Sequence, residues 1–459
     1  MTGAEHPALS RRDFYARLKE LALPIAFQQF MLAAVSAGDA AMLGFVSQDA
    51  LAAVSLAAQI QFVENLFLGA LVSGATLIMA QYQGRGDRQM VRRVFHLILR
   101  YAAGIGLLFF GAALLAPRLL MGIFADEETL ISIGSAYLRL AAPSYLLTGI
   151  SQCWLCVMKT TGRAKWSAAI SSFAMGLDTV LNAIFIFGLF GVPPMGARGA
   201  ALTTSISRAV ELLLVLWDAR AAKDVPLQRA QLFRLDLGLE RDFWRYSFPV
   251  LLNHLVWGLG TTSCSAIIGH LGGEITAANS IAAVIKNVIL CFTRGVANGG
   301  GILLASVLGA GELESARICG RQLSRLSVLC GLCSGGLVLL VGPPVSRSMV
   351  LNDAARHDLR FMLYICAFYL LTQSVNIVVV NGIFHAGGDT RFDAYSVAVT
   401  MWLIIIPLAM TAAFWWRLPP LTVYFILSMD EAVKIPWVYI HYKKYKWGNN
   451  ITQQNGLQV

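Results

Sequence analysis

The chain has 459 residues, of which 57% are hydrophobic and 14% are charged. So few charges cannot cover a soluble globule of this size, so the composition excludes an ordinary soluble domain and indicates a polytopic membrane protein. The net charge of +10 requires no nucleic-acid partner, because inner loops that face anionic lipid account for it.

Apolar stretches of about 20 residues or more, long enough to cross roughly 30 Å of hydrocarbon, recur along the whole chain. In the first half we expect spans at 21–45, 51–81, 94–117, 130–157, 166–190 and 196–218. In the second half we expect them at 243–269, 276–307, 322–344, 359–384, 393–416 and 420–441. The predicted fold class is an all-α membrane protein with twelve transmembrane helices.

The two halves of the chain resemble each other. A constant shift of 225 positions (249 minus 24) places Pro24 on Pro249 and Gly84 on Gly309, without a gap between them. A register that holds through apolar runs and turn glycines indicates an internal repeat, and two such halves in an apolar chain are typical of a transporter. We therefore expect two six-helix lobes related by this repeat. The predicted domains are an N-terminal lobe at 1–218, a cytoplasmic linker at 219–242, a C-terminal lobe at 243–446 and a cytoplasmic tail without structure at 447–459.

Basic residues give the orientation. If the N-terminus is inside, about two dozen Lys and Arg residues fall in the inner segments and about six fall outside, as the positive-inside rule requires. We expect a multi-pass protein of the cell (inner) membrane with both termini in the cytoplasm.

Catalytic and metal motifs are absent from the sequence. It contains no G-x-x-x-x-G-K-[ST], H-E-x-x-H or G-x-S-x-G pattern. Cys153-x-x-Cys156 and Cys330-x-x-Cys333 lie inside apolar spans without a second pair or a histidine at metal spacing. We expect no enzyme activity, no metal site and no cofactor, and transport should be passive or driven by an ion gradient.

Several motifs in order resemble those of the multidrug and toxic compound extrusion (MATE) family, in its prokaryotic form. They are Asp39-Ala-Ala-Met-Leu-Gly44, Leu51-Ala-Ala-Val-Ser-Leu56, Ser73-Gly-Ala-Thr76, Pro193-Pro-Met-Gly196 and Leu308-Gly-Ala-Gly311. The similarity covers roughly 15–445. It implies two lobes around a central cavity, alternating access, and export of organic cations in exchange for H⁺ or Na⁺.

Carboxylates at membrane depth are costly to keep there, so each is a candidate functional residue. At 1.5 Å per residue, Asp39 lies about 27 Å along its helix from Leu21, and Asp178 about 21 Å from Ala164, so both reach the outer half of the bilayer. Asn182 follows Asp178 at i+4 on the same helix face.

The resemblance adds a role for these residues. The acidic residue on the first helix of the family is a coupling site, and Asp39 matches it. Some prokaryotic members add an Asn/Asp couple on the fifth helix, which stands here in reversed order as Asp178 and Asn182. We expect H⁺ or Na⁺ coupling at these three residues.

Other ionisable residues are weaker candidates for coupling or substrate binding. They are Glu64, His254 and Lys286, and each could instead be structural. The 225-residue shift carries Asp39 to Cys264, so coupling should belong to the N-terminal half unless one of these three takes part. Two i,i+3 pairs, Arg208 with Glu211 and Glu431 with Lys434, are interpreted as structural.

Substrate contact should come from ring faces and thioethers, which hold a flat apolar cation without directional hydrogen bonds. The candidates are Tyr145, Phe173, Met175, Trp257 and Met401. Pro24 is the predicted bend that lets the first helix rearrange.

Three alternatives to a cation antiporter stay open. A lipid-linked saccharide flippase of the same broad superfamily would need a cationic cavity, which Lys286 favours and Asp39 and Asp178 oppose. An intramembrane enzyme would need a nucleophile–base pair or a metal cluster, and a receptor or structural protein would not need buried carboxylates in one lobe alone. The expected partners are small organic cations and the lipid bilayer, and a monomer needs no further subunit to form the cavity.

Overall fold

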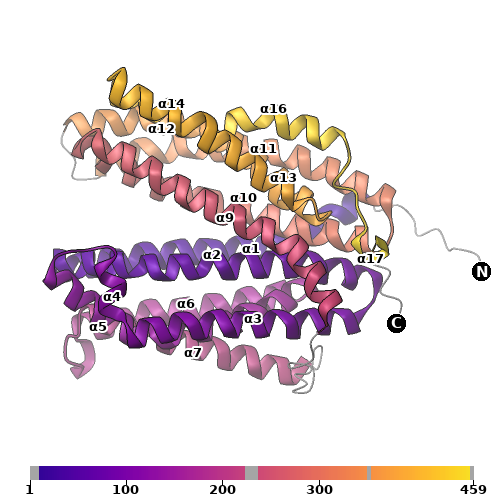
Figure 1. Ribbon diagram of the computed structural model, residues 1–459, viewed down its shortest axis with the longest axis horizontal. Coiled ribbons are helices and arrows are strands. Elements are labelled where there is room, and N and C mark those ends of the chain that lie inside the picture. Colours follow the sequence, from indigo (N-terminus) through magenta and orange to yellow (C-terminus); the bar gives the residue numbers. More distant parts are fainter. Residues whose placement is uncertain (1–9, 223–235, 349–352, 455–459) are drawn as a thin grey trace, which may run out of the picture. The chain divides into compact units, whose positions relative to one another are not determined.

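The protein is helical throughout the residues that the computed structural model describes, which are 10–222, 236–348 and 353–454 (Figure 1). Among these residues, ten helices are long and apolar enough to cross a membrane. The all-α membrane fold is therefore confirmed. The two other predicted spans correspond to α9 (Leu237–His270) and to the pair α15 (Pro420–Leu427) and α16 (Asp430–Lys443), which a turn at Ser428 separates.

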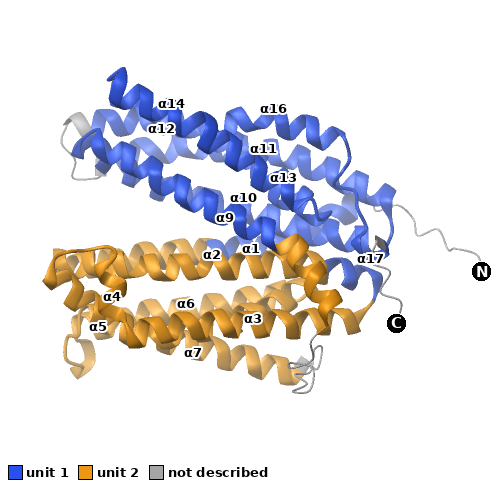
Figure 2. Ribbon diagram, viewed as in Figure 1, with its two compact units in different colours: residues 1–29, 80–86, 248–459 blue, residues 30–79, 87–247 orange. Residues whose placement is uncertain are grey.

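The chain divides into two compact units (Figure 2). Unit 1 comprises the described residues of 1–29, 80–86 and 248–459, and unit 2 comprises those of 30–79 and 87–247. Three helices therefore change unit along their length, namely α1 (Arg11–Val46), α2 (Gln48–Arg85) and α9. The lobe boundaries predicted at residues 218 and 243 assign each of α1 and α2 to a single lobe and do not divide α9 between the two units.

Unit 2 is built around α5, which packs against α3 and α7, while α7 also packs against α6. Asp87 begins α3 by accepting a hydrogen bond from the backbone of Met90 at 2.9 Å, which satisfies one free amide of the first turn. Besides parts of α1, α2 and α9, the unit contains α3 (Arg88–Leu115), α4 (Pro117–Gly122), α5 (Glu128–Thr160), α6 (Ala164–Phe187), η1 (Leu189–Gly191) and α7 (Ala197–Ala222).

Unit 1 is built around α10, α11 and α12, which pack against one another. Two of its membrane-length helices contain π-helical turns, a feature that is often found near functional sites. Its further elements are α10 (Gly273–Gly309), α11 (Leu313–Ser348), α12 (Asp353–Asn376), η2 (Ile377–Phe384), α13 (Thr390–Val397), η3 (Ala398–Ile405), α14 (Ile406–Met410), η4 (Thr411–Trp415) and α17 (Ile451–Gln454).

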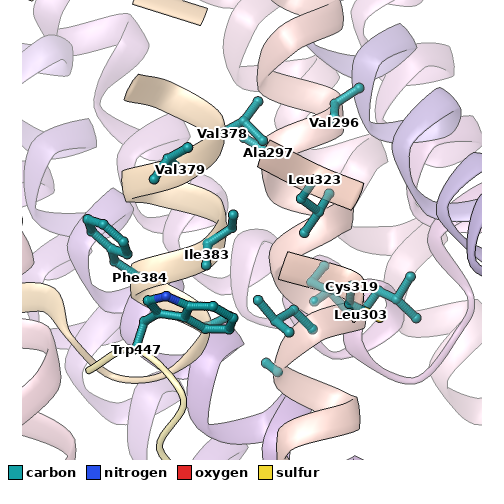
Figure 3. Close-up of a cluster of buried hydrophobic side chains, with 14 of the residues drawn as sticks. Val296, Ala297, Leu303, Cys319, Leu323, Val378, Val379, Ile383, Phe384 and Trp447 are labelled. Carbon is teal, nitrogen blue, oxygen red and sulfur yellow. The ribbon is translucent and has the colours of Figure 1, made fainter. Parts of the chain in front are cut away.

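The C-terminal segment, residues 447–454, is packed into unit 1. Trp447 is fully buried, and Figure 3 shows its indole below Ile383 and Phe384 of η2. The tip of the ring lies against α11, where a Cβ atom on Gly320 would be 2.4 Å from Cη2 of the indole. The indole nitrogen donates a hydrogen bond to the carbonyl of Tyr442 at 3.1 Å. We expected no structure over 447–459, and for 447–454 that expectation is wrong, because burial of the indole ring holds the segment in place. Residues 455–459 lie outside the described part of the chain.

Side chains at the end of α2 form hydrogen bonds with this segment. Gln81, itself fully buried, donates to the carbonyls of Ala386 at 2.8 Å and Asn449 at 3.2 Å, and accepts from the backbone of Ile451 at 2.9 Å. Arg85 donates to the carbonyl of Thr452 at 2.7 Å. The end of α2 thus belongs to unit 1 through buried hydrogen bonds with the C-terminal segment and with the residues after η2.

The same part of α2 crosses α10 at two glycines. A Cβ atom on Gly84 would lie 1.8 Å from the carbonyl oxygen of Ser306, and a Cβ atom on Gly309 would lie 1.8 Å from the carbonyl oxygen of Gln81. Only glycine allows the two backbones to approach so closely. The 225-residue shift carries Gly84 to Gly309 and Gln81 to Ser306, so the two contacts are related by the repeat.

Candidate functional site

The structure brings Asp39, Asp178 and Asn182 together within unit 2. The amide nitrogen of Asn182 donates to Oδ1 of Asp39 at 2.8 Å and to Oδ2 of Asp178 at 3.2 Å. Asp178 and Asn182 are one turn apart on α6, as the sequence predicts, whereas Asp39 comes from the part of α1 that belongs to unit 2. One amide therefore joins two carboxylates from two helices.

Thr203 of α7 completes the group, although it was not among the predicted site residues. Its hydroxyl donates to Oδ1 of Asn182. Because the amide oxygen is held in this way, both N–H bonds of Asn182 remain directed at the two carboxylates. Thr203 is followed directly by two more hydroxyl-bearing residues, Thr204 and Ser205, so only the rotation of α7 distinguishes it from them.

The group is largely shielded from water. Asp178 is 8% exposed, Asn182 1% and Thr203 0%, while Asp39 is partly buried. Among the residues that the structure describes, Oδ1 of Asp178 has no hydrogen bond of ordinary geometry, although the Ser207 side chain lies near enough to act on the carboxylate. A buried carboxylate is costly unless it is paired or neutralised, so the group is suited to receive a proton or a small cation.

Arg208 is the cation that acts electrostatically on Asp178, but its guanidinium is bound elsewhere. It donates to Oε2 of Glu211 at 2.9 Å, and Oε1 of the same carboxylate accepts from Ser171 at 3.0 Å. Glu211 is fully buried. The predicted i,i+3 pair is thereby confirmed, and it leaves the charge of Asp178 without a salt bridge from Arg208.

Glu64 lies on α2 within unit 2 and is 0% exposed. Neither of its carboxylate oxygens has a hydrogen-bond partner. His254 and Lys286 belong to unit 1, where His254 acts electrostatically on Asp393 and the ammonium of Lys286 lies 4.8 Å from the centre of the Tyr369 ring. Of the three weaker candidates, Glu64 alone shares a unit with Asp39.

A second buried polar cluster, in unit 1, was not predicted. Asp393 of α13 is 2% exposed and accepts hydrogen bonds from Asn253 at 2.8 Å and from Lys434 at 3.4 Å, and His385 lies 3.1 Å from it. The predicted i,i+3 partner of Lys434, Glu431, instead accepts a hydrogen bond from Asn376 at 2.7 Å. Packing of α13 beside α16 supplies Lys434 with a carboxylate that lies 41 residues away in sequence.

The five residues predicted to contact substrate differ in exposure. Phe173 is 60% exposed and Trp257 is 38% exposed, so their ring faces are available within their own units. The other three are buried in the packing of their units, namely Tyr145, Met175 and Met401.

Pro24 lies within α1, which continues as a helix on both sides of it. The proline is in the part of α1 that belongs to unit 1, five residues before Gln29, where that part ends. Among the residues that the structure describes, no group of three or more His, Cys, Asp or Glu side chains is placed to hold a metal ion.

The family model MatE matches residues 24–184 and again residues 249–411. Each half of the chain therefore matches the same family, which agrees with the internal repeat.

Individual relatives match along most of the chain. The uncharacterized transporter YisQ of Bacillus subtilis is 22% identical over 396 residues, covering 85% of this chain and 86% of the relative. The probable multidrug resistance protein NorM of Thermotoga maritima is 22% identical over 431 residues, covering 94% of this chain and 92% of the relative. The crystal structure of the Vibrio cholerae MATE transporter VcmN aligns with a TM-score of 0.86 at 17% identity, over 96% of this chain and 98% of that chain. The chain therefore belongs to the MatE family, the multidrug and toxic compound extrusion transporters.

Proposed function

We propose that this protein exports organic cations, drugs among them, in exchange for H⁺ or Na⁺ that bind at Asp39, Asp178 and Asn182. The observation that carries the proposal is the single amide of Asn182 that joins two carboxylates, while Arg208 is bound to Glu211. Relatives named as multidrug resistance proteins support the substrate class.

The chemistry of the group suits either ion. Two carboxylates held close together repel each other, and one proton shared between them removes that repulsion. Na⁺ is a hard cation that prefers oxygen ligands, and the two carboxylates, the amide oxygen of Asn182 and the hydroxyl of Thr203 are all oxygen donors. The family resemblance leaves both ions possible, so the experiment below distinguishes them.

Exchange follows from the cost of burying charge. When an ion neutralises Asp39 and Asp178, the conformation that buries them becomes less costly, and the site loses its attraction for a cationic substrate. Helix α1 carries Asp39 in unit 2 and Pro24 in unit 1, so a bend at Pro24 is a direct way for neutralisation to alter both units. Ion and substrate then favour opposite states, which is the requirement for antiport by alternating access.

Substrate binding uses Phe173 and Trp257, the exposed members of the predicted set. Their ring faces attract an organic cation without fixing its shape. We place both termini in the cytoplasm, because basic residues are concentrated in the inner segments. We further propose that the protein acts as a monomer in the cell (inner) membrane.

A flippase for lipid-linked saccharides is less well supported. The residue in its favour was Lys286, whose ammonium lies 4.8 Å from the Tyr369 ring centre and interacts with Asp430. The positive charge of Lys286 is therefore already stabilised by these neighbours within unit 1.

The test is ethidium efflux from everted vesicles under an imposed proton gradient and, separately, an imposed Na⁺ gradient. Wild type is expected to pump under one gradient, which identifies the ion, and Asp39→Asn is expected to lose that response while remaining folded and inserted. Asp49→Asn is the matched control, because Asp49 is exposed at the start of α2. Wild type that moves no ethidium under either gradient would contradict the proposal and make lipid-linked substrates the next test.

A further inference from the structure

Glu64 lies in the middle of an apolar stripe on α2. Residues spaced at three and four positions share one face of a helix, and on this face Glu64 is the charged residue between apolar neighbours. A Cβ atom added to Gly149 of α5 would lie 3.6 Å from Cδ2 of Leu68, one turn from Glu64, so this part of the stripe faces α5 inside unit 2. All members of the stripe are at most 7% exposed: Ala53, Ala57, Ile60, Glu64, Leu68, Leu71 and Ala75.

The carboxylate of Glu64 is not stabilised by hydrogen bonds. Both of its oxygens are buried, and neither has a hydrogen-bond partner among the residues that the structure describes. The groups that act on it electrostatically are Arg208 of α7, whose guanidinium is bound to Glu211, and Tyr145 of α5. Glu64 therefore has no cation of its own.

Glu211 provides an internal comparison, because it is equally buried at 0% exposure. It has a salt bridge to Arg208 and a hydrogen bond from Ser171, which are the usual requirements for a buried negative charge. Glu64 has neither. An ionised carboxylate without hydrogen bonds or a salt bridge costs far more than a neutral carboxylic acid, so Glu64 holds a proton in this conformation.

We propose that Glu64 is a second proton carrier, so that two protons enter for each organic cation exported, one at the Asp39–Asp178–Asn182 group and one at Glu64. In the conformation described here the Glu64 O–H bond is intact. When the stripe of α2 is exposed to water, that bond breaks, the proton passes to water, and Arg208 stabilises the carboxylate that is formed. A proton from the other side of the membrane restores the acid before the stripe is buried again.

Arg208 gives the two proton sites a common partner. It acts electrostatically on both Asp178 and Glu64 while its guanidinium is bound to Glu211. Ionisation of either acid changes the field at the other through this cation. The proposal rests on the proposed function, because it requires cation export driven by protons.

The experiment measures how far a proton gradient can concentrate ethidium in proteoliposomes. With the membrane potential clamped at zero and a pH difference of about one unit, each coupled proton multiplies the final ethidium ratio by about ten. Wild type is expected to reach a ratio of about 100, and Glu64→Gln, which has the same shape but cannot titrate, a ratio of about ten.

Glu64→Asp is the matched control. It disturbs packing more than Gln because it is shorter, yet it keeps a titratable carboxyl, so it is expected to retain a ratio of about 100. A Gln variant that also reaches about 100 would show that Glu64 is structural.

Measurements on wild type alone also test the proposal. A wild-type ratio of about ten, or transport that follows a Na⁺ gradient and ignores the pH difference, overturns the role of Glu64 but leaves export intact. Wild type that concentrates no ethidium under either gradient overturns the proposed function itself, so the two failures are distinguishable.

Discussion

Asp178 of unit 2 and Asp393 of unit 1 are both buried carboxylates, at 8% and 2% exposure, yet their surroundings differ. Asp393 accepts a hydrogen bond from the ammonium of Lys434 at 3.4 Å and from Asn253 at 2.8 Å. Asp178 has neutral neighbours, the amide of Asn182 and the hydroxyl of Ser207, and within the described part of the chain no cation forms a salt bridge with it. A carboxylate that forms a salt bridge with a buried cation is a fixed part of the fold, whereas one that forms no salt bridge is available to bind and release an ion.

The largest effect should follow from removing the cation of the paired site. Lys434→Met leaves the charge of Asp393 buried without its ammonium, and we expect a loss of about 3–5 kcal/mol in stability. Thermal unfolding of the detergent-purified protein measures this loss. Lys444→Met is the control, because Lys444 is exposed. If both variants unfold at the same temperature, Lys434 does not stabilise Asp393 and the contrast between the two sites is lost.

The same substitution at each aspartate should have opposite consequences. Asp178→Asn removes the carboxylate that we propose to bind the ion and leaves no salt-bridged cation without its partner, so we expect transport to fall at least about tenfold while thermal stability is kept. Asp393→Asn deprives Lys434 of its partner and should lower stability. Efflux assays and unfolding curves on both variants provide the measurement. A stable Asp393→Asn that fails to transport would assign ion coupling to unit 1 as well.

A smaller effect is expected when the hydroxyl of Thr203 is removed. Thr203→Val removes the hydroxyl that holds the Asn182 amide, a change worth about 1 kcal/mol, which corresponds to roughly a fivefold higher ion concentration for half-maximal transport. Thr204→Val is matched in chemistry, because both hydroxyls lie 2.9 Å from the Ala200 carbonyl of their own helix, but that of Thr203 also bonds to Asn182. Equal shifts for the two variants would show that Thr203 has no special part in the site.

The sequence predicts those features that depend on one helix. Asp178 and Asn182 lie four residues apart, so their shared face follows from helix geometry alone. The pair of Arg208 and Glu211 follows from the same rule and is found. The repeat and the apolar spans likewise predict the membrane fold, because each span must satisfy its backbone hydrogen bonds within itself.

Features that depend on how helices pack were not predictable from the residues. Lys434 has a carboxylate at i−3 in Glu431, yet it bonds to Asp393 from another helix. Thr203 and Thr204 are neighbours of the same type, and only the rotation of α7 directs one of them at Asn182. Trp447 lies in a polar stretch of sequence, and its burial depends on the space that Gly320 of α11 leaves for the ring, which the sequence does not reveal.

The crossing of α2 and α10 is symmetric with respect to the internal repeat. Gly84 meets Ser306 and Gly309 meets Gln81, and the repeat exchanges these two pairs. In a symmetric homodimer, residue i of one subunit meets residue j of the other while j meets i, and such an interface is called isologous. This single chain thus carries an isologous interface between two copies of one helix, as a dimer fused end to end would. A side chain at Gly84 would collide with the backbone of Ser306, and one at Gly309 would collide with the backbone of Gln81. The repeat therefore imposes the same restriction on both positions.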